Sequence, residues 1–244
     1  MAEFRMKVAG QVAVVWTLFE STLEYCRPYL TEEAPDFSIE TTRENLAFEQ
    51  EARNTEAREE GLRIRISTDP FLERLSIQRK FAEHLFDHDT LLFHGSTVAV
   101  DGKAYLFTAR CGTGKSTHTR LWRQVFGDRA VMVNDDKPFL RITADGVFAC
   151  GSPWSGKHGL DTNIEVPLQG ICVLQRGNEN RIRRASREEV IDRLLHEAYC
   201  PLDPEKQKQF QALVEALAAK TPLWRMECNR DPQAASVSFE AMSK

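Results

Sequence analysis

The sequence lacks the cysteine spacing of a metal or redox centre. Its six cysteines are scattered, and no two of them are spaced as Cys-x-x-Cys. This absence argues against a zinc knuckle and against a thioredoxin-type site. Scattered cysteines are also typical of a reducing compartment, so we expect a cytoplasmic protein.

The sequence also lacks a long apolar run and a strong excess of charge of one sign. The apolar stretch at residues 12–19 is short and is followed by an acidic residue, so we expect neither a secretory signal nor a membrane span. The net charge of −4 provides no general basic field, so we expect no nucleic-acid partner. With 42% apolar and 28% charged residues, the composition is that of an ordinary folded protein.

What the sequence does contain is a glycine-rich motif at residues 109–116, Ala-Arg-Cys-Gly-Thr-Gly-Lys-Ser. It follows the phosphate-loop pattern GxxxxGKS, with alanine in place of the first glycine. An apolar run enters it and a helical pattern leaves it, and this strand–loop–helix context is the one that phosphate loops have. Gly112 and Gly114 allow the backbone to turn its N–H groups toward phosphate oxygens.

We therefore expect this loop and the helix after it to bind the phosphates of ATP. We expect Lys115 to reach the β- and γ-phosphates and the Ser116 hydroxyl to bind Mg²⁺. The helix N-terminus adds partial positive charge. The predicted nucleotide-binding residues are Arg110, Cys111, Gly112, Thr113, Gly114, Lys115, Ser116 and Thr117.

A pair of carboxylates follows the next predicted strand. The apolar run at residues 130–133 ends in Asn134-Asp135-Asp136. Ligands of open α/β sheets lie at the carboxyl ends of strands, so these side chains are placed to act on a bound nucleotide. One carboxylate can bind Mg²⁺ and the other can take a proton from an acceptor hydroxyl. The alternative is a polar turn with no chemical role.

Three further cations are candidates for the same site. His94 precedes the first predicted hairpin and can approach the γ-phosphate or Asp135. Lys157 lies in the glycine-flanked loop at residues 151–162, and Arg176 ends a predicted strand. Lys157 and Arg176 fit contacts to phosphate and ordinary surface positions equally well. His84 and His88 are spaced i, i+4, but without a third ligand we prefer a solvated helix face to a metal pair.

Hydrophobic patterns predict the first half of the fold. Residues 8–18 and 62–67 have the pattern of strands, and residues 71–86 have the pattern of a helix. Residues 43–60 fit either an exposed helix or a mobile arm. Asp101-Gly102 predicts the turn of a hairpin with strands at residues 97–100 and 104–107.

The second half has a mixed strand and helix pattern. A second hairpin is predicted at residues 139–150, later strands at residues 170–174 and 223–228, and helices at residues 187–199 and 204–220, with a last helix opened by Asp231-Pro232. The fold class is therefore α/β. We expect residues 90–244 to form a mixed sheet flanked by helices. Residues 1–89 are expected to form a β-rich N-terminal extension that packs on this core.

The motifs together resemble the catalytic domain of the HPr serine kinase/phosphorylase family, which shares a P-loop fold with phosphoenolpyruvate carboxykinases. The resemblance covers about residues 90 to 176. Its matching residues are His94-Gly95 before the hairpin, Gly114-Lys115-Ser116, and Val133-Asn134-Asp135-Asp136. The chain is similar to short HPr-kinase-like proteins, including those that phosphorylate a serine of peptide natural-product precursors.

The resemblance implies a Mg²⁺–ATP-dependent kinase that transfers the γ-phosphoryl group to a hydroxyl of a serine or a serine-like small molecule. It assigns Asp135 to the acceptor hydroxyl, with His94 close by, and Ser116 and Asp136 to Mg²⁺. Lys157 and Arg176 are the candidate charge stabilisers. Two alternatives stay open: a carboxykinase-like enzyme acting on an oxaloacetate-type acid, and a non-enzymatic nucleotide switch. The sequence does not identify the acceptor or decide whether the protein forms a homo-oligomer.

Overall fold

The computed structural model describes residues 1–59, 61, 63–110 and 112–244. The chain divides into two compact units, Met1–His84 and Leu85–Lys244. Helix α3, Asp69–Phe86, runs across this boundary. Within the described residues, we find no helix that combines the length and the apolar character needed to cross a bilayer.

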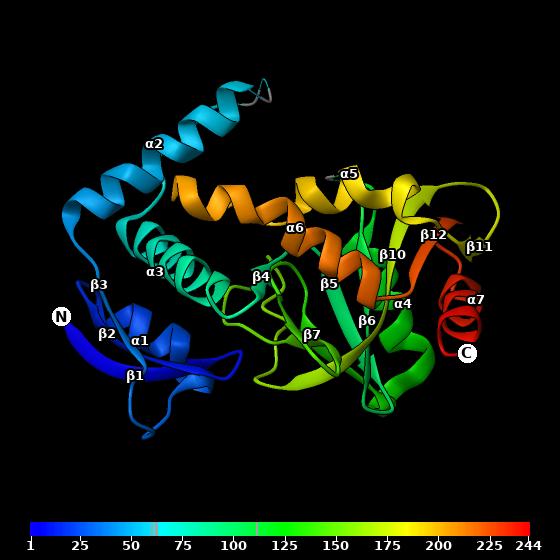
Figure 1. Cartoon of the computed structure of the whole chain (residues 1–244), viewed down its shortest axis with the longest axis horizontal. Coiled ribbons are helices and arrows are strands. Elements are labelled where there is room, and N and C mark those ends of the chain that lie inside the picture. Colours follow the sequence, from blue (N-terminus) through cyan, green and yellow to red (C-terminus); the bar gives the residue numbers. More distant parts are fainter. Residues whose placement is uncertain (60, 62, 111) are drawn as a thin grey trace. The chain divides into compact units, whose positions relative to one another are not determined.

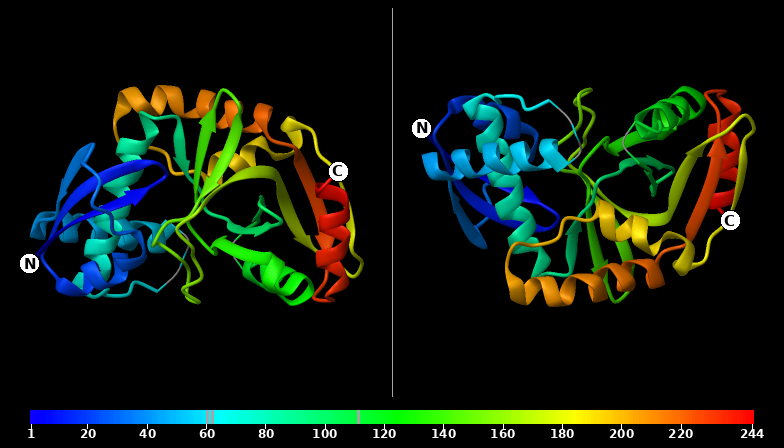
Figure 2. Two further views of the ribbon diagram at one scale, coloured as in Figure 1. Left: turned by 90° about the horizontal axis from the view of Figure 1, so that it is seen from below. Right: turned by 90° about the horizontal axis from the view of Figure 1, so that it is seen from above.

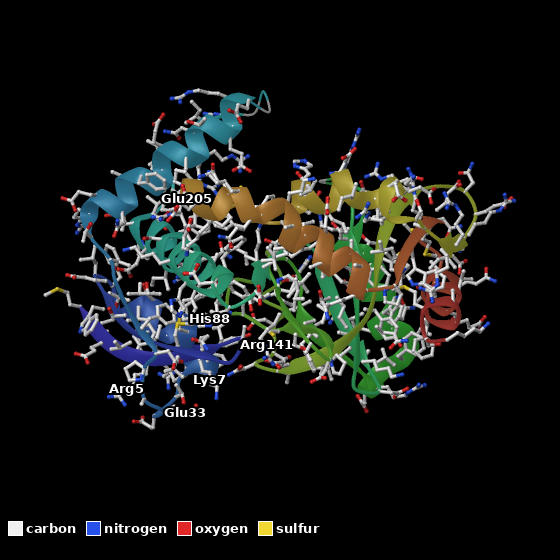
Figure 3. All side chains as sticks on the ribbon, viewed as in Figure 1. Arg5, Lys7, Glu33, His88, Arg141 and Glu205 are labelled. Carbon is white, nitrogen blue, oxygen red and sulfur yellow. The ribbon has the colours of Figure 1, made fainter. Side chains whose placement is uncertain are left out.

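The N-terminal unit contains a small sheet and helices. Strands β1 (Ala2–Val8) and β2 (Gln11–Thr17) form a hairpin, and β3 (Phe37–Glu40) pairs parallel to β2. The strand predicted at residues 8–18 is confirmed over Gln11–Thr17, but its first residues are wrong. The chain turns back at Ala9 and Gly10, which have φ angles of 50° and 81°. Figure 3 shows Lys7 of β1 beside Glu33, with which it forms an ion pair at 2.8 Å.

The helices of this unit are α1 (Glu20–Cys26), a short 3₁₀ turn (Arg27–Tyr29), α2 (Arg43–Glu59) and α3. The unit is thus more helical than the β-rich extension that we predicted. Glu73 of α3 is fully buried and accepts hydrogen bonds from Leu18 N (2.5 Å), Thr22 Oγ1 (2.5 Å) and Thr41 Oγ1 (2.7 Å). This carboxylate ties the helix to the segments beside the sheet.

The strand predicted at residues 62–67 is also wrong. Leu62 lies outside the described residues, and residues 63–67 form neither strand nor helix. Ile66 is 94% exposed, so the alternating pattern does not mark a buried face. The side chain of Gln50 in α2 donates to Arg65 O (3.1 Å) and accepts from Ser67 N (2.8 Å), and this replaces strand pairing for part of the segment.

The C-terminal unit is built on one mixed sheet, whose strands are labelled in part in Figure 1. The strands are β4 (Thr90–Leu92), β5 (Ser96–Val100), β6 (Lys103–Thr108), β7 (Ala130–Asn134), β8 (Phe139–Thr143), β9 (Gly146–Cys150), β10 (Glu165–Arg176), β11 (Arg181–Arg184) and β12 (Leu223–Cys228). Their order is β4-β8-β9-β10-β6-β5-β7, with β12 beside β10 and β11 beside β12. Strands β6, β10 and β12 are parallel.

Helices cover both faces of this sheet. They are α4 (Lys115–Phe126), α5 (Arg187–Glu197), α6 (Pro204–Lys220) and α7 (Gln233–Met242), with a 3₁₀ turn at Gly127–Arg129 after α4. Residues of α5 and α6 pack in one core cluster, and residues of α4 and α7 pack in another. Figure 2 shows α4 and α6 on opposite sides of the sheet.

Both predicted hairpins, the helix after the phosphate loop and the later helices are confirmed. The mixed sheet flanked by helices is confirmed as well. Strands β1, β3, β4 and β11 were not predicted, and the last three have four residues or fewer. Such short strands carry too few residues for a period-two pattern to be recognised.

Candidate active site

The phosphate loop joins β6 to α4. Gly112 and Gly114 have φ angles of 73° and 127°, which side-chain-bearing residues rarely adopt, so the two glycines are needed for this path. The N–H of Thr113 donates to Arg110 O at 3.1 Å, and that of His118 donates to Gly114 O at 2.9 Å. Helix α4 begins at Lys115 with no side-chain cap. Its N-terminal N–H groups are thus available to an anion. Cys111 lies outside the described residues.

A cavity of about 530 Å³ opens beside the loop, and it contains most of the predicted site residues. They come from the loop and α4, from the segment between β4 and β5, from the end of β7 and from the loop after β9. The lining residues are His94, Gly112, Gly114, Lys115, Ser116, Thr117, Arg120, Asp135, Asp136, Gly156, Lys157 and His158. We call it the carboxylate cavity. The phosphate loop and the aspartate pair, which are separate in the sequence, therefore lie close together in the fold.

Asn134 fixes the turn that presents the two carboxylates. It is fully buried at the end of β7, and its Oδ1 accepts from Asp136 N (2.8 Å) and Lys137 N (2.6 Å). Its Nδ2 donates to Ser152 O at 2.8 Å. The backbone around the aspartate pair is therefore held from both sides, which restricts the directions of the two side chains.

Asp135 is the more buried of the two aspartates, with 4% of its surface exposed. Its Oδ1 accepts a hydrogen bond from Gly156 N at 2.5 Å. Burial raises the pKa of this carboxyl above its usual value, although the Gly156 bond opposes the shift. A Cβ at position 156 would lie 3.3 Å from both carboxylate oxygens, so glycine allows this close approach.

Asp136 contacts His94. His94 Nε2 lies 3.3 Å from Asp136 Oδ1, and Gly95 N donates to Asp136 O at 3.0 Å. Burial raises the pKa of Asp136, but the bond to His94 and the charges of Lys137 and Lys115 outweigh burial and lower it overall. His94 was expected to act on Asp135, but it contacts Asp136, because Gly95 bonds to the backbone of that residue and places the ring beside it.

A third carboxylate, which the sequence analysis missed, lies behind His94. His94 Nδ1 is 2.7 Å from Glu197 Oε2, and His94 N donates to Glu197 O at 2.8 Å. Glu197 also pairs with Arg193 at 2.9 Å. The hydrogen bonds that Asp136 and Glu197 accept raise the pKa of His94, and those that Glu197 accepts from His94 and Arg193 lower the pKa of Glu197 against the effect of burial. The two carboxylates thus favour the charged form of the imidazole.

Lys115 points back toward the strand that delivers it, since its Nζ donates to Ala109 O at 3.2 Å. Its charge nevertheless acts on Asp136 and on Glu197. Lys157 and His158 also line the cavity, and they belong to the loop whose Gly156 bonds to Asp135. The cavity therefore combines two carboxylates with several cations, which suits a ligand that carries both phosphate groups and a metal ion.

Among the described residues, three predicted ones do not line this cavity: Arg110, Thr113 and Arg176. Arg176, at the end of β10, donates from Nε to Thr113 O at 3.3 Å and from Nη2 to Gly112 O. It supports the loop through these carbonyls and does not line the carboxylate cavity. Arg110 lines a separate cavity of about 830 Å³ together with Arg176, Arg193 and Arg225. We call it the arginine cavity.

The chain was compared with known proteins. No family model matches it, and no curated protein sequence matches it. Among solved structures, the Hpr(Ser) kinase/phosphatase from Coxiella burnetii is similar to 62% of this chain and 95% of its own, with a TM-score of 0.38 and 10% sequence identity. Values this low carry no argument about function, which therefore depends on the geometry of the site.

Proposed function

We propose that the protein is a Mg²⁺–ATP-dependent kinase that transfers the γ-phosphoryl group to a hydroxyl. One observation carries the proposal: the phosphate loop and the strand-end carboxylate pair line the same cavity of about 530 Å³. Phosphoryl transfer needs phosphate binding, a metal site and a group that orients the nucleophile, and it needs little else from the protein. All three requirements can be assigned to residues of this cavity.

Lys115 and the N–H groups at the start of α4 bind the β- and γ-phosphates. Asp135 takes the proton of the acceptor hydroxyl. The hydroxyl oxygen forms a bond to the γ-phosphorus, the bond from that phosphorus to the β–γ bridging oxygen breaks, and ADP leaves. Burial supports this role of Asp135, because it raises the pKa and so strengthens the carboxylate as a proton acceptor.

Ser116 and Asp136 are the residues that would hold Mg²⁺. Mg²⁺ prefers oxygen ligands, and it is bound in nucleotide sites by one or two carboxylates together with phosphate oxygens. The lowered pKa of Asp136 keeps this carboxylate ionised, and Ser116 lines the same cavity with an exposed side chain. When bound, the ion supplies positive charge that neutralises the phosphate oxygens. His94 orients Asp136, and Lys157, which also lines the cavity, contributes charge.

The acceptor is a serine of a peptide or protein, or a small molecule with a similar hydroxyl, and the setting is the cytoplasm. No feature of the cavity favours the carboxykinase alternative, because among its described lining residues Arg120 is the single arginine. An oxaloacetate-type acid needs several arginines around it. A non-enzymatic nucleotide switch would use the same phosphate loop, so phosphoryl transfer itself separates the two.

The test is incubation of the protein with ATP labelled in the γ-phosphate, together with separate pools of peptides and metabolites. We expect Mg²⁺-dependent transfer to one class of acceptor, read by mass spectrometry. The product should survive acid treatment, as hydroxyl phosphate esters do and acyl phosphates do not. ATP binding without transfer in either pool contradicts the kinase and favours the switch.

A further inference from the structure

A second cavity adjoins the phosphate loop, on the side of β10 and β12. It has a volume of about 410 Å³. Thr117 and His118 of α4 form one wall, and Gly177, Cys228 and Arg230, which follow the ends of β10 and β12, form another. The volume lies in the range of small-molecule sites. We call it the strand-end cavity.

This cavity and the carboxylate cavity meet along the loop. Gly112, Gly114 and Thr117 line both of them. A phosphate chain that lies on these residues with its terminal phosphate beside the carboxylates therefore has its other end at the strand-end cavity. The arginine cavity shares Gly112 with the loop, but among the described residues it includes none from 114 to 117. It does not continue the path of a phosphate chain at the start of α4.

His118 gives the strand-end cavity an unused hydrogen-bonding group. It is 2% exposed, and burial lowers its pKa to about 4, so the ring is neutral. Trp122 Nε1 donates to His118 Nε2 at 3.2 Å. Nε2 also lies 3.1 Å from Ser238 Oγ, to which Trp122 Nε1 donates at 2.9 Å. Nδ1 is buried and has no hydrogen-bond partner among the described residues. A buried polar atom without a partner is unfavourable, and a hydrogen bond to a ligand would satisfy it.

We propose that the strand-end cavity binds the nucleoside of the phosphoryl donor, with His118 Nδ1 forming a hydrogen bond to a polar atom of the base or the ribose. The proposal rests on the proposed function and deepens it, because it assigns the place where the protein recognises ATP beyond its phosphate chain. Arg230 lies at the surface of the cavity, where its guanidinium can lie over a base.

Cys228 is a built-in probe of this cavity. It is half-buried and lines the cavity, whereas Cys200 is exposed and lines none of the three cavities described above. The experiment measures the alkylation rate of each cysteine by peptide mass spectrometry under limited modification. The protein is free, saturated with Mg²⁺–ATP, or saturated with Mg²⁺–tripolyphosphate. Burial raises the pKa of the Cys228 thiol, so its labelling requires alkaline buffer and long incubation.

We expect ATP to slow alkylation of Cys228 about tenfold or more, and tripolyphosphate to change it less than about twofold, with Cys200 unaffected by both. Equal protection by both ligands overturns the nucleoside assignment. So does a lack of protection by ATP when calorimetry shows that ATP is bound. If calorimetry detects no binding of ATP, the proposed function fails as well, and the two failures are thereby distinguished.

A larger side chain that fills the strand-end cavity gives a second test on the intact protein. Cys228→Phe should weaken ATP binding about tenfold or more and leave tripolyphosphate binding within about twofold of the wild type, because only the nucleoside needs the space. Retained tripolyphosphate binding shows that the loop is still folded. Cys200→Phe is the matched control and should bind both ligands as the wild type does. Wild-type ATP affinity in Cys228→Phe overturns the proposal.

Discussion

The carboxylate cavity and the arginine cavity lie on two sides of one loop and differ in size and charge. The arginine cavity is the larger, at about 830 Å³ against about 530 Å³. It collects Arg110, Arg176, Arg193 and Arg225, opposed by Glu189 and Asp192. The carboxylate cavity has the helix N-terminus, the loop lysine and two carboxylates. We therefore assign the proposed site by the groups that line each cavity and not by cavity volume, and the carboxylate cavity is the one with both phosphate-binding and acidic groups.

The two cavities are joined by a chain of hydrogen-bonded charges. Arg193 lines the arginine cavity and pairs with Glu197, which holds His94, which in turn contacts Asp136. Arg193 of the arginine cavity thus helps to hold the aspartate pair, even though our proposal assigns phosphate chemistry to the carboxylate cavity. The following variants distinguish residues that position the loop and the aspartates from residues that we propose to act on the phosphate groups.

The largest effect is expected for Lys115→Ala. No other loop residue in the described part of the carboxylate cavity carries a positive charge, so phosphate charge would be left uncompensated. Transfer should fall by at least about 10²–10³-fold, with weaker ATP binding. Single-turnover transfer and calorimetry measure the two quantities. A mutant with wild-type transfer would show that the nucleotide phosphates bind elsewhere.

Arg176→Ala tests support of the loop from the arginine side. The guanidinium donates to the carbonyls of Gly112 and Thr113, so its loss frees the loop without removing a group from the carboxylate cavity. We expect ATP affinity to fall about three- to tenfold, with the transfer rate at saturating ATP changed by less than about threefold. A loss confined to the transfer rate would instead place Arg176 at the transferring phosphate.

Glu197→Gln tests the link between the cavities. Losing this carboxylate should lower the pKa of His94, which an NMR titration measures, and slow transfer about threefold to tenfold. Because the pKa of His94 is raised in the fold, its stabilising ion pairs are complete below the ordinary histidine value of about 6.5 and are lost as pH rises through the folded value.

The loss of unfolding free energy in Glu197→Gln should therefore be larger at pH 6 than at pH 9 in urea titrations. Glu188→Gln, on the exposed side of the same helix, is the control and should leave the His94 titration unchanged. An unchanged His94 pKa in Glu197→Gln would mean that the hydrogen bond does not set the charge of the ring.

The smallest effect is expected for Arg225→Ala. Arg225 lines the arginine cavity but contacts neither the loop nor the pair of aspartates in any described hydrogen bond or ion pair. Transfer and ATP affinity should stay within about twofold of the wild type. A large loss of transfer would show that the arginine cavity takes part in the reaction, which would contradict the distinction between the two cavities.

The parts of the site that the sequence predicted are those encoded locally. The loop needs glycines at fixed positions, α4 follows it directly, and β7 ends in Asp135 and Asp136, so short patterns suffice. Their meeting in one cavity follows from strand pairing in one sheet. Arg193 and Glu197 have the i, i+4 spacing of an ordinary helix-surface pair, and nothing in the sequence indicates that α5 brings Glu197 to His94.

The segment at residues 63–67 shows the opposite case. Its alternating pattern predicted a strand, yet a strand forms only where a partner edge and a buried face exist. In the fold, Gln50 satisfies part of its backbone and Ile66 faces solvent. The turn at Ala9-Gly10 was missed because Val8 and Val12 on either side of it are both β-branched, so the predicted strand began before the turn.

The most direct measurement of the central claim compares Asp135→Asn with Asp136→Asn in single-turnover transfer and in ATP affinity at two Mg²⁺ concentrations. We expect Asp135→Asn to keep nearly normal Mg²⁺–ATP binding and to lose transfer by about a hundredfold or more, as for a missing general base. Asp136→Asn should raise the Mg²⁺ requirement as well as slow transfer. Exchanged phenotypes would reverse the two roles. Wild-type transfer in both variants would contradict a kinase site at these carboxylates.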